Sequence, residues 1–319
     1  ECLIQIFKKE NEVMLKKNIK VFGLISTLIF SVVLAGCGNS AEDTAELGGE
    51  EITIPYSDAG STVRSMVLAE VLEDAGYNVS LTKVEADGSL YAAATENSDT
   101  MHMDGWLPNT HEDYWDKYGE DLVVYDNEAI IENPSVSLAV PEYMEDVNSI
   151  EDLKDNDELG ESVDWTIQGI DPRNGVMAKT DDAIEDNGLG DWKLNESSEM
   201  EMIKTVQESY ENEAPVIFTG WTPHWLFETL DLKMLSDPDN IYDAEDDSIN
   251  LVFNSGFENE HPAAYKIAVN MAEDWSQNDE NTLMERIFVD GDNSQETIES
   301  FVDSNSNRID DWKKDTVAE

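Results

Sequence analysis

The fold is indicated most clearly by residues 51–84, which read EITIPYSDAGSTVRSMVLAEVLEDAGYNVSLTKV. The β-branched and apolar run at 51–56 predicts a strand. Residues 63–75 have the apolar periodicity of a helix, which begins after two hydroxyl side chains and stops at Gly76. Residues 77–84 predict a second strand. A strand, a helix and a strand in this order predict a parallel sheet.

The same alternation continues along the chain and predicts an α/β fold. Further strands are expected at 135–140, 163–170 and 215–219, and helices near 176–185, 200–210 and 263–276. Such a protein divides into two lobes, each a mainly parallel sheet flanked by helices, with the ligand in the cleft between the lobes. The chain is expected to cross between the lobes at Val140–Pro141 and to return within 226–242. The first lobe would then comprise residues 51–140 and 240–319, and the second lobe residues 141–239.

The charge of the chain excludes several functions. It has 71 Asp and Glu residues against 19 Lys and Arg, for a formal net charge of -52. Too few cations are available to neutralise the phosphates of a nucleic acid or an anionic membrane surface. The 40% of hydrophobic residues and the 8 Trp exclude wholesale disorder. Because the acids are spread along the chain, we expect a halophilic protein whose self-repulsion is screened by salt; an ordinary acidic secreted protein is the alternative.

The N-terminal segment has the features of a bacterial lipoprotein signal peptide. Lysines precede an apolar run at 21–34, which is shorter than the roughly 20 residues of a membrane span. The run ends in Leu-Ala-Gly-Cys, which resembles the lipobox of a lipoprotein and predicts lipid attachment at Cys37. Residues 1–36 are therefore interpreted as an upstream extension with a signal peptide, and residues 37–50 as a lipid-anchored tether. These features predict an extracytoplasmic protein anchored to the cell membrane.

Three segments carry side chains suited to ligand binding. Residues 104–111 read DGWLPNTH, residues 169–177 read GIDPRNGVM and residues 219–225 read TGWTPHW. The first and last place a Trp directly after a Gly, at the end of an expected strand and shortly before a Pro. The middle segment places a turn at the start of a helix, where backbone N–H groups can bind an anion.

Together these segments predict a site for a small zwitterion with a methylated ammonium at one end. Trp106 and Trp221 offer aromatic faces that attract a cation. His111 and the helix-start amides would bind a carboxylate. Each residue also has a purely structural interpretation: either Trp can be a packing residue, His111 a capped loop residue and Gly175 a requirement of turn geometry. The sequence has none of the G-x-S-x-G, H-E-x-x-H, Walker or C-x-x-C motifs of enzymes, and its 4 His lack metal-ligand spacing.

The three segments, with VNSIEDL at 147–153 and DLKML after the last of them, resemble glycine betaine-binding lipoproteins of osmoprotectant ABC importers. The resemblance runs from about residue 51 to beyond Trp275, which is nearly the whole chain after the tether. It implies the two-lobed fold of type II periplasmic binding proteins, which closes on its ligand.

The resemblance also implies a role for each candidate residue. Trp106 and Trp221 would be walls of an aromatic cage around the trimethylammonium group. His111 would bind the carboxylate of the ligand, together with the backbone N–H groups of Gly175 and Val176.

The sequence departs from the family at one place. Family members usually have a third cage Trp near the end of the first strand, whereas residues 56–60 here read YSDAG. Tyr56 could supply the missing aromatic face, Asp58 could face the cation directly, or Trp192 could enter from the other lobe. An acidic residue beside the cage would also suit choline, which has no carboxylate to be repelled.

The resemblance predicts a substrate-binding protein and no enzyme, cofactor or metal. We expect the protein to capture glycine betaine or proline betaine and to deliver it to an ABC transporter permease. A choline or carnitine receptor of the same fold is the nearest alternative. Two alternatives come from other classes: a secreted hydrolase with a carboxylate pair in the cleft, and an adhesion module that binds a protein through its Trp residues.

Overall fold

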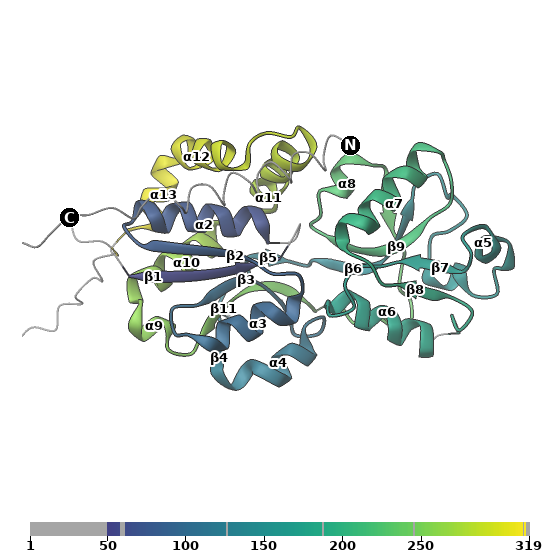
Figure 1. Ribbon diagram of the computed structural model, residues 1–319, viewed down its shortest axis with the longest axis horizontal. Helices are drawn as coiled ribbons and strands as arrows, with labels where there is room; N and C mark the ends of the chain where they lie inside the picture. Colours follow the sequence, from purple (N-terminus) through teal and green to yellow (C-terminus); the bar gives the residue numbers. More distant parts are fainter. Residues whose placement is uncertain are drawn as a thin grey trace, which may run out of the picture. The chain divides into compact units, whose positions relative to one another are not determined.

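The computed structural model describes residues 50–57, 61–125, 127–186, 188–244, 246–314 and 316 (Figure 1). The expected signal peptide and the expected lipid attachment residue Cys37 lie outside these residues, and so does Asp58. Within the described part of the chain, no helix is long and apolar enough to cross a membrane.

The β-α-β unit predicted at 51–84 is present. β1 (Glu51–Tyr56) pairs in parallel with β2 (Asn78–Lys83), and α2 (Thr62–Asp74) connects the two strands. An isolated parallel bridge places β1 beside the residue that precedes β3 (Met101–Leu107). In Figure 1, α2 lies along β1 and β2. The β1–β2 pair and the sheet β3-β11-β4 are thus joined by this bridge, and together they are called the first sheet; the carboxyl ends of β1 and β3 point the same way in it.

β3 is buried along its whole length and carries the first Trp motif. It pairs antiparallel with β11 (Ser248–Asn254), which also pairs antiparallel with the short strands β4 (Leu122–Val124) and β5 (Ile131–Glu132). The helices that precede and follow β3 are α3 (Asp87–Glu96) and α4 (Glu112–Tyr118).

The second sheet has the strand order β10-β6-β9-β7-β8. Its members are β6 (Ser135–Pro141), β7 (Thr166–Gln168), β8 (Lys193–Asn195), β9 (Ile217–Thr222) and β10 (Leu232–Met234). β7 pairs in parallel with β8 and β9, whereas β6 is antiparallel to β9 and β10. The second sheet is therefore mixed, because β6 runs against its neighbours. In the first sheet the parallel pair β1–β2 stands beside strands that pair antiparallel with β11, where mainly parallel sheets were expected.

β6 joins the second sheet from its first residue, Ser135, which pairs with Thr222. The expected division had placed residues 51–140 in the first lobe, so the chain changes sheet earlier than expected. The partner of β6 is a strand far along the chain, which the local pattern around β6 does not identify. The chain returns to the first sheet between β10 and β11.

The strand expected at 163–170 is much shorter, because a tight turn delays its start to Thr166. Asp164 and Trp165 have φ angles of 54° and 55°, in the left-handed region that strands do not use. The ring of Trp165 packs directly on Gly160. A side chain at residue 160 would clash with it, because a Cβ there would lie 2.5 Å from the ring.

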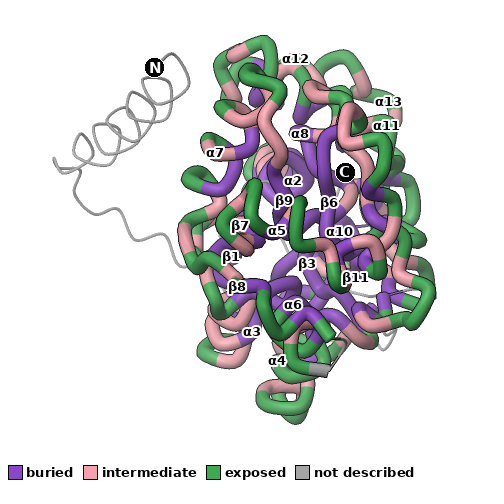
Figure 2. Tube along the Cα trace, turned by 90° about the vertical axis from the view of Figure 1, so that its right-hand side faces the viewer, coloured by how far each residue is buried: buried purple, intermediate pink, exposed green. Residues whose placement is uncertain are grey.

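Helices cover both sheets and begin close to the predicted positions. The remaining helices are α5 (Asp157–Ser162), α6 (Gly175–Asp186), α7 (Glu199–Glu211), α8 (Leu226–Thr229), α9 (Phe257–Glu260), α10 (Pro262–Asp274), α11 (Gln277–Met284), α12 (Ser294–Ser304) and α13 (Ser306–Trp312), with short helical turns at Gly119–Asp121, Ile150–Leu153 and Glu285–Val289. α7 and α11 begin with capping boxes at Ser198 and Ser276. In Figure 2, β6 and β9 are drawn as buried, whereas α12 carries many exposed residues.

Candidate functional site

The motif at 104–111 forms a turn at the end of β3, in which Trp106 and His111 bind each other. The backbone N–H of His111 donates to the carbonyl oxygen of Trp106 at 2.9 Å, and the backbone N–H of Trp106 donates to His111 Nδ1 at 3.3 Å. The indole N–H of Trp106 donates to Asp104 Oδ1 at 2.8 Å. Since Trp106 is only 6% exposed and His111 only 2%, both rings are held in one orientation.

A buried carboxylate from a distant part of the chain fixes the middle of this turn. Asp247 accepts the backbone N–H of Asn109 at 2.6 Å and that of Thr110 at 3.0 Å, and it also accepts the hydroxyl of Thr110. Asp247 is 3% exposed, so these donors compensate for the burial of its charge. The backbone before His111 is therefore fixed independently of the His111 side chain.

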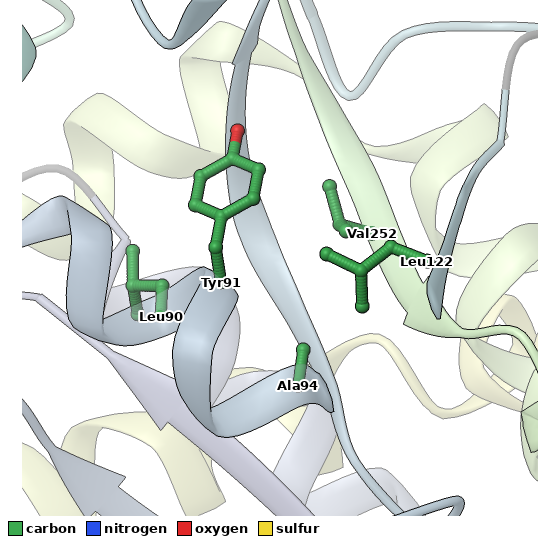
Figure 3. Close-up of a cluster of buried hydrophobic side chains, with 5 residues drawn as sticks. All are labelled: Leu90, Tyr91, Ala94, Leu122 and Val252. Atoms are coloured by element: carbon green, nitrogen blue, oxygen red, sulfur yellow. The ribbon is translucent and has the colours of Figure 1, made fainter. Parts of the chain in front are cut away.

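The hydrogen bonds of His111 identify its tautomer. Because a backbone N–H can only donate, the contact from Trp106 makes Nδ1 the acceptor, and the neutral ring then has its hydrogen on Nε2. Nδ1 also lies 3.2 Å from the hydroxyl of Tyr91. Burial raises the pKa of Tyr91 well above its usual value, so its hydroxyl stays protonated at neutral pH and can donate to Nδ1. The Tyr91 ring belongs to an apolar cluster with Leu90, Ala94, Leu122 and Val252 (Figure 3).

Two N–H donors converge on one oxygen of Asp87, the first residue of α3. His111 Nε2 lies 3.1 Å from Asp87 Oδ2, and the backbone N–H of Gly175, the first residue of α6, donates to the same oxygen at 3.0 Å. The backbone N–H of Asp87 donates in turn to Asn174 Oδ1 at 2.9 Å. The arrangement is therefore an anion site, occupied by a carboxylate of the chain itself.

Gly175 is required for the close approach of α6 to the turn. A Cβ at this position would lie 2.4 Å from the carbonyl oxygen of Thr110 and 3.0 Å from Cδ2 of His111. Val176 is 6% exposed and is the second residue of α6, so its N–H belongs to the first turn, whose N–H groups have no partner within the helix. The structure thus brings Gly175 against His111, two of the three residues expected to bind a carboxylate, and Val176 follows Gly175 in α6.

A buried ion cluster lies beside Trp106. The guanidinium of Arg64, which is fully buried, contacts Asp104 Oδ1 and Glu280 Oε1, each at 3.0 Å. Burial alone would raise the pKa of Asp104, but the charge of Arg64 and the hydroxyl of Ser57 hold this pKa below its usual value. Burial raises the pKa of Glu280, although Arg64 opposes this. Asp104 is therefore a charged carboxylate in contact with the indole of Trp106.

Tyr56 ends the strand whose next residue reaches this cluster. It is the last residue of β1 and is 5% exposed. The next residue, Ser57, donates its hydroxyl to Asp104 Oδ2 at 2.6 Å. The end of β1 therefore lies beside the end of β3, where a third aromatic face was expected.

Trp221 and Trp192 have separate surroundings. Trp221, on β9, is 9% exposed and meets the ring of His224 edge-on at 4.8 Å. Trp192 meets the ring of Trp165 edge-on at 5.5 Å, and its indole N–H donates to a backbone carbonyl at 3.1 Å. Among the ring contacts of the described residues, none joins Trp192 to Trp106 or Trp221. Trp192 therefore has the contacts of a packing residue.

The sequence alone did not identify the residues that hold the expected ligand-binding side chains in place. Asp104 stands in the DGWLPNTH motif, two residues before Trp106, and this spacing on a strand could have identified it. Asp87 and Asp247 had no comparable signal among 71 Asp and Glu residues. Arg64 lies in the apolar run of α2, where a buried cation requires acidic partners.

A family model for the substrate-binding domain of ABC-type glycine betaine transport systems matches residues 50–304. The chain belongs to this family. The matched residues include every strand of both sheets and extend from β1 to the end of α12.

Individual relatives agree with this assignment. The glycine betaine/carnitine transport binding protein GbuC of Listeria monocytogenes serotype 1/2a (strain 10403S) is 34% identical over 157 residues, which are 49% of this chain and 51% of that protein. The match therefore spans about half the length of this relative. The crystal structure of lactococcal OpuAC, closed and complexed with glycine betaine, is 30% identical with a TM-score of 0.74 and covers 83% of this chain and 100% of that chain. The Borrelia burgdorferi glycine betaine, L-proline-binding protein (ProX) is 26% identical with a TM-score of 0.75, over 82% and 96% of the two chains.

These similarities establish the fold and the class of activity. The α/β fold is that of type II periplasmic binding proteins, as predicted. The family consists of substrate-binding transport proteins and not of enzymes, so the hydrolase alternative was wrong. Substrate-binding proteins of ABC importers are extracytoplasmic. Within the described residues, no group of three or more His, Cys, Asp or Glu could hold a metal ion.

Proposed function

We propose that the chain is the receptor of an osmoprotectant ABC importer for glycine betaine, or for a close relative such as proline betaine. The observation that carries this proposal is the pair of N–H donors, from His111 Nε2 and Gly175, that meet on one carboxylate oxygen at 3.1 and 3.0 Å. The carboxylate of a bound betaine could make the same two contacts in place of Asp87. The family assignment and the lactococcal relative crystallised with glycine betaine support the proposal.

In this proposal the trimethylammonium group binds the aromatic faces of Trp106 and Trp221. Each such face contributes about 0.5–2 kcal/mol, most where water is excluded. The charge of Asp104 favours a cation beside Trp106. For the third face we favour Tyr56, because the end of β1 lies beside Asp104. Asp58 follows Tyr56 closely and stays a candidate, whereas the contacts of Trp192 with Trp165 support it least.

The two sheets would form the centres of two lobes that close on the ligand, and the permease would bind the closed form. We further propose that the protein is held at the membrane by a lipid on Cys37 and works at high salt, as the N-terminal sequence and the net charge of -52 suggest. Cys37→Ser should abolish incorporation of radiolabelled palmitate in cells. Unchanged labelling of this variant would contradict the proposed lipid attachment.

A choline receptor is the second candidate, and one observation favours it. Because Asp87 already accepts both donors of the anion site, a ligand without a carboxylate would bind without any change there. Carnitine carries a carboxylate and would meet the same competition as glycine betaine.

Titration of the purified protein with glycine betaine, proline betaine, choline and carnitine tests these candidates. Trp fluorescence would be followed in about 1 M salt, where repulsion between the acids is screened. Trp106→Ala should abolish binding. Trp106→Phe keeps an aromatic face but loses the hydrogen bond to Asp104, so it should weaken binding about tenfold.

Trp165→Phe is the matched control, because this Trp packs on Trp192 and takes no part in the proposed cage. It should bind every ligand like the unmodified protein. A folded protein that responds to none of the four ligands would contradict the proposed function. Equal losses in Trp106→Phe and Trp165→Phe would contradict the proposed cage.

A further inference from the structure

Asp87 occupies the position proposed for the carboxylate of the ligand. Its Oδ2 accepts from His111 Nε2 at 3.1 Å and from the Gly175 amide at 3.0 Å. Among the described residues, His111 is the one ion-pair partner recorded for Asp87, and no Lys or Arg lies within ion-pair distance of it. The negative charge of Asp87 is therefore held mainly by the two groups that a carboxylated ligand needs.

The side chain of Asp87 is placed so that it can leave this site. It is 18% exposed, in contrast to the 3% of the His111 side chain. It stands at the first position of α3, where a negative charge is favourable with or without these contacts, and it provides no side-chain cap to the helix. This region is held also by Asp247 and by the hydrogen bond from the backbone N–H of Asp87 to Asn174 Oδ1.

We propose that Asp87 determines specificity by competing with the carboxylate of the ligand for His111 and Gly175. The inference rests on the proposed function of this site. Two carboxylates cannot share these two N–H groups without strong repulsion, since among the described residues no Lys or Arg forms an ion pair with Asp87. A ligand with a carboxylate must therefore displace Asp87, whereas choline leaves it in place.

The competition has a predictable size. A hydrogen bond from a neutral donor to a charged acceptor is worth enough to change a dissociation constant by about tenfold or more. Removing Asp87 from the two donors should therefore tighten the binding of glycine betaine at least about tenfold. Choline offers the vacated donors only the neutral oxygen of its hydroxyl, a weaker acceptor than a carboxylate, and it loses a nearby negative charge, so its binding should change little or weaken.

Isothermal titration of the purified full chain with glycine betaine and with choline tests this inference. Asp87→Ala removes the competing carboxylate, and Asp87→Asn removes only its charge while keeping an acceptor. Asp113→Asn is the matched control, because it removes one charge from an exposed residue in the first turn of α4, close to His111 in the chain. Circular dichroism would confirm that each variant is folded.

We expect Asp87→Ala to tighten glycine betaine relative to choline by at least about tenfold, and Asp87→Asn to do so by a smaller factor because its amide oxygen still accepts from the two donors. Asp113→Asn should change both ligands by the same small factor. Equal changes for both ligands in the Asp87 variants, or weaker binding of glycine betaine, would overturn the inference and leave the receptor function intact. If neither ligand binds to any folded variant or to the unmodified protein, the receptor function itself fails and the inference fails with it.

Discussion

His102 should make the stability of the protein depend on pH in a defined window. It lies on β3 and is fully buried, its Nδ1 accepts the backbone N–H of Asp104 at 3.3 Å, and its ring meets Tyr91 edge-on at 4.8 Å. Its Nε2–H has no hydrogen-bond partner among the described residues. Burial lowers the pKa of His102 from its usual 6.5 to about 3, and the nearby Asp104 only partly opposes this.

The sign and size of the effect follow from proton binding. Between pH 6.5 and about 3, the unfolded chain binds a proton at His102 that the folded protein does not bind. The free energy of unfolding must therefore fall as the pH is lowered through this window. At pH 5 the loss from His102 is about 2 kcal/mol relative to pH 7.5. This is a large part of a total stability of about 5–15 kcal/mol.

Urea unfolding at several pH values between 7.5 and 5, in about 1 M salt, measures this effect. His102→Asn is the test variant, since its side-chain oxygen can accept the N–H of Asp104 but does not titrate. The difference in unfolding free energy between the two proteins should change by about 2 kcal/mol over this range. Thr100→Ser, a buried residue just before β3, should lose stability equally at every pH. Parallel pH profiles of His102→Asn and the unmodified protein would refute the argument.

Three further predictions concern stability and binding. Arg64→Met leaves two buried carboxylates without their cation and should lower the free energy of unfolding by about 3–5 kcal/mol, measured in urea. The control Arg286→Met removes a side chain that is 39% exposed and should lower it by less than about 1 kcal/mol. Similar losses in both variants would contradict the role of the cluster. Gly175→Ala should weaken ligand binding about tenfold in calorimetry, because its Cβ would lie 2.4 Å from the Thr110 carbonyl; unchanged affinity would show that α6 need not approach the turn. Ser276→Ala removes the capping box of α11 and should lower the free energy of unfolding by about 1 kcal/mol, and no change would show that the cap is replaced by water.

The elements that could be predicted are those whose pattern is complete within a short stretch of chain. α7 was expected at 200–210 and is found at Glu199–Glu211, with a capping box at Ser198 that encodes its start. The β-α-β unit at 51–84 could be predicted because its strand and helix patterns are also complete within a short stretch of chain. The sheet that β6 joins could not be predicted, because its partners β9 and β10 are far along the chain and both sheets contain antiparallel strands.

The candidate site divides in the same way. Trp106 and His111 are five residues apart, and the turn that joins them is local to one motif. By contrast, the contact between Asp87 and Gly175 spans 88 residues, and that between Arg64 and Glu280 spans 216. Nothing in a single acidic residue distinguishes Asp87 or Glu280 from the other acids of this chain. Their roles become visible only when the fold places a donor or a cation against them.

Two contributions to ligand preference can be distinguished: the long-range attraction by the net charge of the protein, and the direct contacts in the site. A net charge of -52 attracts a cation such as choline more than a zwitterion, but in 1 M salt this attraction is screened within about 3 Å. Discrimination at high salt must then come from direct contacts. The proposed cage recognises the trimethylammonium group, which choline and glycine betaine share. Among the described residues of the site, the N–H donors of His111 and Gly175 can distinguish the two ligands, and both are bound to Asp87. A change at this one position would therefore alter the preferred ligand while the cage stays the same.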